Sequence, residues 1–256
     1  MNTPINKKFL IVYLLLQMAS FAQCTKLKLY ALYTPSHKIL ATKYFLPSIQ
    51  DDFDIVLVEA SQTSSSAQFM SHGWTATTIK KVELIIKAIK DNWGDIFIFS
   101  DVDIQFFAPI GKLIVGYMKN KDMVIQKDAP SGSLCSGFFA CRANERTLQM
   151  WQHAYAYMKT DRKCSDQPAL NRCLKPQRGK SNAFNVSWEY LPNSFFGGGT
   201  KTGKYWKRKH RLPIPRNIVM HHANWTRGIK NKIAQLEYVK QAVKAFKRRK
   251  KPLRCH

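Results

Sequence analysis

The sequence predicts a single α/β domain with a mixed, mainly parallel central sheet flanked by helices. Short apolar segments alternate with helical segments over the first hundred residues, which is the order expected of a parallel sheet with helices on its faces. One segment, Ile96-Phe97-Ile98-Phe99, is apolar at every position, as expected for a central strand buried on both faces. With 256 residues, 45% of them hydrophobic, the chain has enough apolar material for one large core.

The first half of the chain supplies the elements of this pattern in order. Residues 77–92 have apolar side chains at a helical period, with lysines on the other face, and Gly94 follows the last of them. The other predicted elements are a strand over 28–33, a helix over 36–49, a strand over 53–58 and a polar loop over 61–66.

The second half gives a more mixed pattern, with neither an internal repeat nor a convincing linker. The predicted elements are strands over 123–126, 137–141 and 218–221, helices over 147–159, 166–174 and 233–246, and a Gly-rich loop over 195–203. We therefore assign residues 26–246 to one domain.

The chain is strongly basic. It has 41 Lys and Arg against 16 Asp and Glu, a formal charge of +25, and Glu237 is the only acidic residue after Glu189. The segment 247–256 forms a basic tail. Such a field attracts polyanions such as anionic glycans, nucleic acid and acidic membrane lipid, although a solvated helix end gives the same composition. No recognisable nucleic-acid-binding motif is present, so we expect no specific nucleic acid partner.

The N-terminal segment has the layout of a secretory signal peptide. Lys7 and Lys8 precede an apolar run over 9–18, and Ser20-Phe21-Ala22 provides the small residues of a cleavage site. We expect a signal peptide over 1–22, with a short uncleaved anchor as the alternative. The predicted location is the lumen of the endoplasmic reticulum or Golgi, or the exterior after secretion; an anchor would make the protein membrane-bound.

The six cysteines include no CxxC pair, which argues against a structural zinc site. Two pairs, Cys135 with Cys141 and Cys164 with Cys173, could form disulfides in an oxidising compartment, and free buried thiols are the alternative. Asn185 and Asn224 each begin an N-glycosylation sequon.

Two carboxylates, Asp101 and Asp103, follow the central apolar strand directly. Ligands of parallel α/β sheets bind at the carboxyl ends of the strands. Carboxylate oxygens there suit Mg²⁺ or Mn²⁺, and a bound cation can bridge the phosphates of a nucleoside diphosphate. An Asp-x-Asp sequence at a strand end also occurs as an ordinary turn or helix cap.

Several blocks, taken in order, resemble the nucleotide-diphospho-sugar transferase family, which are enzymes of the GT-A glycosyltransferase fold. The resemblance extends roughly over 28–240. The blocks are Ile96-Phe97-Ile98-Phe99-Ser100-Asp101-Val102-Asp103, Ser136-Gly137-Phe138-Phe139-Ala140, Asp166-Gln167-Pro168-Ala169-Leu170-Asn171, Leu191-Pro192 with Phe196-Gly197-Gly198-Gly199, and His222-Ala223-Asn224-Trp225 with Gly228 and Lys232.

The resemblance implies metal-dependent transfer of a sugar from a nucleoside diphosphate sugar, most simply a UDP-sugar, to a hydroxyl of a glycan, protein or lipid. Asp101 is then placed near the ribose and the sugar, Asp103 is a direct metal ligand, and His222 is the third ligand, with the adjacent His221 as the alternative. An imidazole ligand favours Mn²⁺ over Mg²⁺.

The resemblance also implies contacts with the donor. Lys232 is expected to contact the diphosphate as a point charge, and Lys80, on the helix before the central strand, is a second candidate. Gly137 lets the backbone approach the donor sugar closely. The remaining predicted donor-binding residues are Asn224, Gly228, and Tyr33 and Thr34 at the edge that stacks on the nucleotide base.

Asp166 and Gln167 begin a predicted helix. The resemblance places them at the donor sugar or gives the carboxylate the role of general base toward the acceptor hydroxyl, whereas a plain helix cap is the structural alternative. We assign Asp101, Asp166 and Gln167 as catalytic candidates. Gly197, Gly198 and Gly199 are expected to form a mobile loop on the acceptor side.

Other functions remain open at this point. The basic surface alone is compatible with a polyanion-binding protein without catalysis, and an inactive relative would bind only a sugar nucleotide or a partner. A haloacid-dehalogenase-type phosphatase also has a strand followed by Asp-x-Asp. There the pair lies near the start of the domain and Thr or Val follows two residues later, whereas here the pair lies about a hundred residues in and Gln105 follows.

Overall fold

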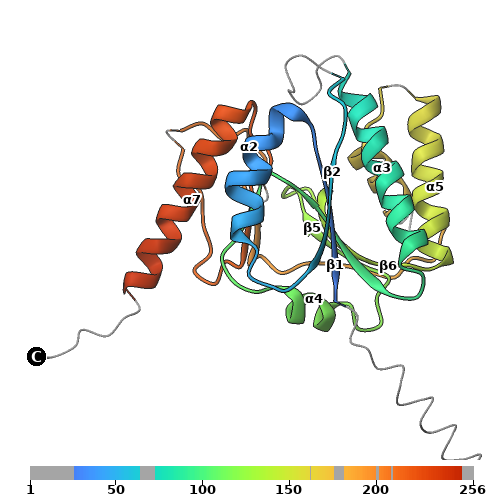
Figure 1. The fold of residues 1–256 in the computed structure, drawn as a ribbon, viewed down its shortest axis with the longest axis horizontal. Coiled ribbons are helices and arrows are strands. Elements are labelled where there is room, and N and C mark those ends of the chain that lie inside the picture. Colours follow the sequence, from blue (N-terminus) through green and yellow to red (C-terminus); the bar gives the residue numbers. More distant parts are fainter. Residues whose placement is uncertain are drawn as a thin grey trace, which may run out of the picture.

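A computed structural model describes residues 26–63, 73–161, 163–175, 182–199, 202–208 and 210–249 (Figure 1). Outside the described residues lie the predicted signal peptide with Cys24, and residues 250–256, which include Cys255. Within the described part, no helix is both long enough and apolar enough to cross a bilayer.

The centre of the molecule is a mixed, mainly parallel sheet, as predicted, and it has six strands. In spatial order its strands are β2 (Asp54–Glu59), β1 (Lys28–Tyr33), β3 (Ile96–Asp101), β6 (Leu134–Arg142), β5 (Met123–Lys127) and β7 (Trp188–Tyr190). The pairs β1–β2, β1–β3 and β5–β7 are parallel, and β6 runs antiparallel to both of its neighbours. Because five strands point the same way, their carboxyl ends lie along one edge of the sheet.

A second sheet of three strands contains β4 (Ile104–Phe106), β9 (Met220–His222) and β8 (Phe195–Gly197), in that order. Strand β9 pairs antiparallel with β4 and parallel with β8. The prediction of a loop over 195–203 is therefore wrong at its start, because residues 195–197 pair with β9. This sheet joins a segment near the end of the domain to the residues that follow β3.

Five longer helices follow in the described part of the chain, and four of them were predicted in this order. They are α3 (Trp74–Asp91), α4 (Gly111–Tyr117), α5 (Glu145–Thr160), α6 (Asp166–Leu174) and α7 (Ile229–Arg249). Helix α4 was not predicted. Helix α7 begins four residues before the predicted start and continues three residues into the predicted tail.

The helix predicted over 36–49 is instead a series of short helical turns. The segments are η1 (Pro35–His37), α2 (Lys38–Leu40), η2 (Ala41–Phe45) and η3 (Leu46–Ser48). Pro47, within η3, has no backbone N–H, and the chain leaves the helical conformation at Ile49. Pro35 at the start and Pro47 near the end thus limit the length of regular helix in this segment.

The two faces of the large sheet bury different layers, since side chains alternate along each strand. Phe97 and Phe99 of β3 face α3, α5 and α6, whereas Ile98 faces the segment 40–53, α4 and the second sheet. Figure 1 shows α3 and α5 on one side of the sheet, and α2 and α7 on the other. The aliphatic and aromatic residues on both faces make the rigid frame that carries the strand ends.

Asp122, next to β5, is a buried carboxylate that fastens one end of this frame. It accepts hydrogen bonds from Asn144 Nδ2 at 2.7 Å and from the backbone of Ser187 at 2.8 Å, and it ion-pairs with Arg146 at 2.7 Å. Burial would raise the pKa of Asp122, but Arg146 and the other donors hold it below its usual value. This carboxylate therefore stabilises the fold in its ionised form.

We expect Asp122→Asn to lower the free energy of unfolding by about 1–3 kcal/mol at pH 7. A lowered pKa in the folded state gives stability that is present above the unfolded pKa and is lost as pH falls through the folded value. Urea unfolding from pH 7 to pH 3 should therefore show the two proteins converging at acidic pH. A difference that stays constant over this range would contradict the assignment.

The four cysteines in the described residues are free and buried. Cys135 and Cys141 lie six residues apart on the single strand β6, which separates their Cα atoms by about 20 Å, too far for a disulfide. The pairing of Cys135 with Cys141 is thus excluded by geometry. Cys164 and Cys173 are likewise free thiols, so the structure agrees with the alternative of buried thiols.

Candidate active site

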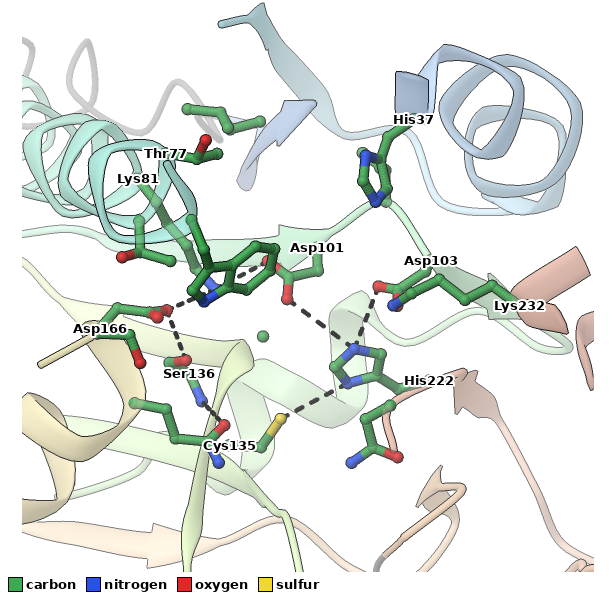
Figure 2. A pocket seen from close by; sticks show the side chains of 18 of the residues that line it. His37, Thr77, Lys81, Asp101, Asp103, Cys135, Ser136, Asp166, His222 and Lys232 are labelled. Carbon is green, nitrogen blue, oxygen red and sulfur yellow. Dashed lines mark hydrogen bonds and ion pairs between the residues drawn. The ribbon is translucent and has the colours of Figure 1, made fainter. Parts of the chain in front are cut away.

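A cavity of about 420 Å³ opens at the carboxyl ends of β1 and β3, where the position of Asp101 and Asp103 predicts a ligand site. Residues from β1, α3, β3, β6, α6, β9 and α7 line it. Its size is in the usual range for small-molecule sites. Figure 2 shows the side chains that point into it.

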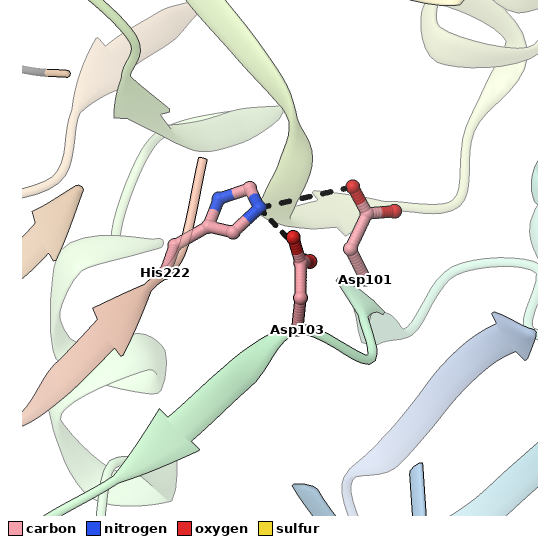
Figure 3. A group of neighbouring side chains, drawn as sticks. All are labelled: Asp101, Asp103 and His222. Carbon is pink, nitrogen blue, oxygen red and sulfur yellow. Dashed lines mark ion pairs between the residues drawn. The ribbon is translucent and has the colours of Figure 1, made fainter. Parts of the chain in front are cut away.

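Asp101, Asp103 and His222 form one cluster at the base of this cavity (Figure 3), with one potential ligand atom from each residue lying within 4.8 Å of the others. His222 Nε2 lies 3.2 Å from Asp103 Oδ1 and 3.9 Å from Asp101 Oδ2. An octahedral cation with bonds of about 2.1 Å holds neighbouring ligand atoms roughly 3 Å apart. The donor set, two carboxylates and an imidazole, suits Mn²⁺ or Mg²⁺. The separation of His222 and Asp103 matches this geometry, whereas Asp101 lies somewhat farther away.

The second sheet explains how residues 119 positions apart in the sequence meet. Asp103 directly precedes β4, whose Ile104 pairs with His222 of β9. The backbone N–H of Ala223 donates to the carbonyl of Asp103 at 2.9 Å, which extends this pairing by one step. Asp101 is the last residue of β3. Backbone pairing, rather than the side chains themselves, thus sets the spacing of the cluster.

His222, and not His221, is the candidate ligand. Successive residues of a strand point to opposite faces, and the His221 ring stacks on Phe196 with 5.4 Å between ring centroids. Burial lowers the pKa of His221 to about 3, with a further contribution from His222, so its imidazole is neutral.

A hydrogen-bonding chain fixes the His222 ring. The Gln126 amide nitrogen donates to the carbonyl of Phe195 at 3.0 Å, so its oxygen faces His222 Nδ1 at 2.9 Å and accepts from it. The thiol of Cys135 is also near Nδ1, at 3.6 Å. With Nδ1 used in this way, Nε2 is directed to the carboxylates, as is usual for an imidazole that binds a metal.

Gly137, on β6, lies against the cluster. A Cβ at this position would be 2.4 Å from His222 Cε1 and 2.6 Å from Asp101 Oδ2, closer than real Cβ atoms come to other heavy atoms. The residue has to be glycine for these side chains to converge. The close neighbours of Gly137 in the structure are side chains of the cluster, and its approach to the donor sugar stays a prediction.

The charges of the cluster compensate one another. Burial would raise the pKa of Asp103, but Lys232, whose ammonium contacts Oδ2, and His222 hold it well below its usual value. Burial alone would lower the pKa of His222, but the adjacent Asp103 outweighs it and raises the pKa to about 10. The predicted contact residue Lys232 thus lies directly beside the predicted metal ligand Asp103.

A second ion-pair network borders the first. The ammonium of Lys81, on α3, lies 2.9 Å from Asp101 and 2.9 Å from Asp166 (Figure 2). Burial would lower the pKa of Lys81, but Asp101 and Asp166 raise it well above its usual value. Lys81 therefore stays charged and connects Asp101 with the start of α6. The predicted residue Lys80 does not line the cavity, and its ammonium contacts Ser61.

Asp166 and Gln167, at the start of α6, both line the cavity. The buried Asp166 carboxylate accepts from Ser136 Oγ at 2.7 Å, and Ser165 is the N-cap residue of the helix, so Asp166 lies inside the first turn. Gln167 Nε2 donates to Asp128 Oδ2 at 3.0 Å. The structure thus brings both predicted residues into the same cavity as Asp101.

Asp128 joins several parts of the cavity wall, although it was not predicted. Its carboxylate accepts from Gln167, from Asn224 Nδ2 and from the indole nitrogen of Trp225, each at 3.0 Å. The predicted residue Asn224 therefore lines the cavity but uses its amide nitrogen for Asp128. Because Asn224 is only 8% exposed, the folded chain hides this sequon.

The remaining predicted residues lie around the mouth. Tyr33 and Thr34, at the end of β1, line the cavity, and the Tyr33 hydroxyl donates to Glu59 at 2.6 Å. Thr34 Oγ1 lies 3.1 Å from Nδ1 of His37, a lining residue absent from the predictions. Gly228, with φ of +78°, precedes α7 and also lines the cavity.

The chain is similar in structure to several solved glycosyltransferases. The chain aligns with a glycosyltransferase involved in glycosylation of the major capsid of PBCV-1, at 13% identity, over 84% of this chain and 99% of that chain, with a TM-score of 0.55. It aligns with the galactosyltransferase LgtC, solved with donor and acceptor sugar analogs, at 11% identity over 86% and 96%, with a TM-score of 0.51. It aligns with GlyE of Streptococcus pneumoniae at 9% identity, over 86% of this chain and 64% of that chain, with a TM-score of 0.51. The comparison with curated proteins gave no match.

These likenesses establish the GT-A fold, and together with the family match they define the protein as a glycosyltransferase. The model of the nucleotide-diphospho-sugar transferase family matches residues 41–236, which is most of the chain. The chain therefore belongs to this family. The family implies a nucleotide-sugar donor, and the cluster of Asp101, Asp103 and His222 is a site that fits a divalent cation.

Proposed function

We propose that the protein transfers a sugar from a nucleoside diphosphate sugar, in the simplest case a UDP-sugar, to a hydroxyl acceptor, with Mn²⁺ or Mg²⁺ held by Asp101, Asp103 and His222. The observation that carries this proposal is the convergence of these side chains, from β3 and β9, in a cavity of a chain that belongs to a nucleotide-sugar family. The imidazole in the donor set favours Mn²⁺.

Each further residue has a physical role in this proposal. A cation held by Asp101, Asp103 and His222 would supply positive charge that stabilises the departing diphosphate. Lys232, beside Asp103, adds a second positive charge for the departing diphosphate. Thr34, at the end of β1, borders the space for the nucleotide. Lys81 holds the carboxylates of Asp101 and Asp166 in place, where they face the donor sugar.

Asp166 stands at the opposite side of the cavity from Lys232 in Figure 2, and Gln167, the next residue of α6, also lines the cavity. In this proposal the donor sugar meets the acceptor there. Gln167 donates one hydrogen bond to Asp128, which fixes its amide plane. Asp166 is held by Lys81 and Ser136, so it is an oriented acceptor for a sugar hydroxyl. Both residues bind and orient the donor sugar in this proposal.

The test is release of UDP from UDP-sugars in the presence of Mn²⁺, with Asp103→Asn as the comparison. Asparagine keeps one oxygen ligand but loses the charge, so we expect Mn²⁺ affinity to fall about 100-fold. Electron paramagnetic resonance of free Mn²⁺ measures this affinity directly. The proposal fails if the wild-type protein binds neither Mn²⁺ nor UDP, or if Asp103→Asn binds both as tightly as the wild type.

A further inference from the structure

The mouth of the cavity carries one indole, one phenol and one guanidinium in contact with one another. The rings of Trp225 and Tyr205 lie 5.5 Å apart at an interplanar angle of 47°, and both residues line the cavity. The guanidinium of Arg227 lies over the Tyr205 ring, 4.4 Å from its centroid. Tyr205 is 37% exposed and Arg227 is exposed. We call these three residues the aromatic platform.

The backbone at Trp225 is strained. Its φ of +54° is in the left-handed region, which a bulky residue seldom adopts and which costs about 1–3 kcal/mol. Three contacts hold it there. The indole N–H donates to Asp128 at 3.0 Å, the backbone carbonyl accepts from Trp206 at 2.8 Å, and Gly199 packs against the ring so closely that a Cβ there would be 2.1 Å from Cδ1. Strain maintained by several contacts is typical of a functional position.

The aromatic platform is connected to the proposed donor-sugar residues. Asp128 accepts from the Trp225 indole and from Gln167 at the same oxygen, Oδ2. The indole position is thus coupled to Gln167, the neighbour of Asp166. A molecule that stacks on Trp225 would lie next to the place where the transferred sugar is expected.

The surface beyond the aromatic platform is basic. Between residues 202 and 248 the only acidic residue is Glu237. The segment 202–218 packs against α7 through Trp206, Leu212 and Ile218 on one side and Val239 and Val243 on the other. We call this segment together with α7 the basic lobe. Among its residues whose exposure the structure describes, the exposed cations are Lys204, Lys207, Arg208, Arg211, Arg216, Lys230, Lys244, Lys247 and Arg248.

Arg227 lies where the basic lobe meets the cavity. Within the described residues no carboxylate is within 4.0 Å of its guanidinium, so its charge is available to a ligand. Stacking on Tyr205 fixes its position. A fixed, unneutralised cation beside exposed aromatic rings recognises a molecule that has both an apolar face and a negative charge.

We propose that Trp225, Tyr205 and Arg227 form the acceptor subsite, and that the acceptor is an oligosaccharide carrying acidic groups. The apolar face of a sugar ring packs on the aromatic rings, and a carboxylate or sulfate pairs with Arg227. The basic lobe binds further acidic residues of the same chain and raises its local concentration. This inference rests on the proposed function, because an acceptor subsite has meaning only beside a donor site.

The test measures binding of three probes to the full protein saturated with Mn²⁺ and UDP. They are hexagalacturonate, its fully methyl-esterified neutral form, and a sulfated galacto-oligosaccharide of the same length. We expect at least one acidic probe to bind about tenfold more tightly than the neutral probe. Comparison of the two acidic probes distinguishes a carboxylate ligand from a sulfate ligand.

Matched variants locate the binding. Trp225→Gly removes the ring while glycine accepts the positive φ, and we expect it to weaken all three probes about tenfold. Arg227→Gln should bring the acidic probes to the level of the neutral one. Lys119→Gln removes one charge at an exposed position after α4, outside both the cavity lining and the basic lobe, and should leave hexagalacturonate affinity within twofold. Isothermal titration calorimetry measures each affinity.

The outcomes separate this inference from the proposed function. If the wild-type protein binds UDP with Mn²⁺ but Trp225→Gly binds the probes unchanged, only the acceptor inference is overturned. Equal effects of Arg227→Gln and Lys119→Gln, or equal binding of acidic and neutral probes, also overturn it and leave a general polyanion surface. If the wild-type protein does not bind UDP with Mn²⁺, the proposed function itself fails.

Discussion

Replacement of Gly137 by alanine is expected to abolish cation binding and catalysis while the protein remains folded. The added methyl group would stand 2.4 Å from His222 Cε1 and 2.6 Å from Asp101 Oδ2, and it would force the two side chains apart. A metal site tolerates ligand displacements of only about 0.2 Å. We expect kcat/KM to fall by at least about 1000-fold, equivalent to roughly 4 kcal/mol of transition-state stabilisation.

The same change should have a modest effect on the fold. Overpacking of one methyl group costs about 1–3 kcal/mol, so Gly137→Ala should still unfold cooperatively in a thermal melt. Gly116→Ala, on α4, is the matched control, because no heavy atom lies within 4 Å of a Cβ there. It should leave Mn²⁺ affinity and activity unchanged. Gly137→Ala with Mn²⁺ affinity within threefold of the wild type would refute the placement of the cation between Asp101 and His222.

The part of the site that the sequence predicts best is the part built by regular strands. An unbroken apolar strand followed by Asp101 and Asp103 indicates a site at a sheet edge, because strand ends bind ligands in parallel α/β folds. His222 could be predicted as a ligand only from the family resemblance, because its approach to Asp103 depends on the pairing of β4 with β9. Strands as short as these, each of three residues, carry little sequence pattern. For the same reason the start of β8 was predicted as a loop.

To predict which side chains of a helix face the cavity, one has to know which face of the helix is buried. Lys80 was the predicted residue, but Lys81 lies four residues before Ile85 and eight before Ile89, on the buried face of α3. The spacing to these residues could have identified it. Asp128 and Gln126 have no such marker, because their roles arise from partners about 40 to 100 positions away. Only the folded chain shows which donors a buried carboxylate or amide receives.

Lys81→Met is expected to lower the free energy of unfolding by about 3–5 kcal/mol, the usual cost of removing one partner from a buried ion pair. Methionine has a similar length and keeps the apolar packing of α3. The loss arises mainly at Asp166, whose side chain is only 6% exposed and would keep Ser136 as its hydroxyl donor but lose its positive partner. Asp101, at 34% exposed, can recover hydration. Urea unfolding at pH 7 measures this difference.

The double variant Lys81→Met with Asp166→Asn tests the cause of this loss. If the penalty is an unpaired buried carboxylate, neutralising Asp166 should restore at least about half of the lost stability, since replacing both members of a buried pair is often nearly neutral. Activity should not return, because Asp101 would still lack its ammonium partner and Asp166 its charge. A double variant as unstable as Lys81→Met alone would show that Lys81 stabilises α3 through packing, and that the bridge between Asp101 and Asp166 contributes little to the fold.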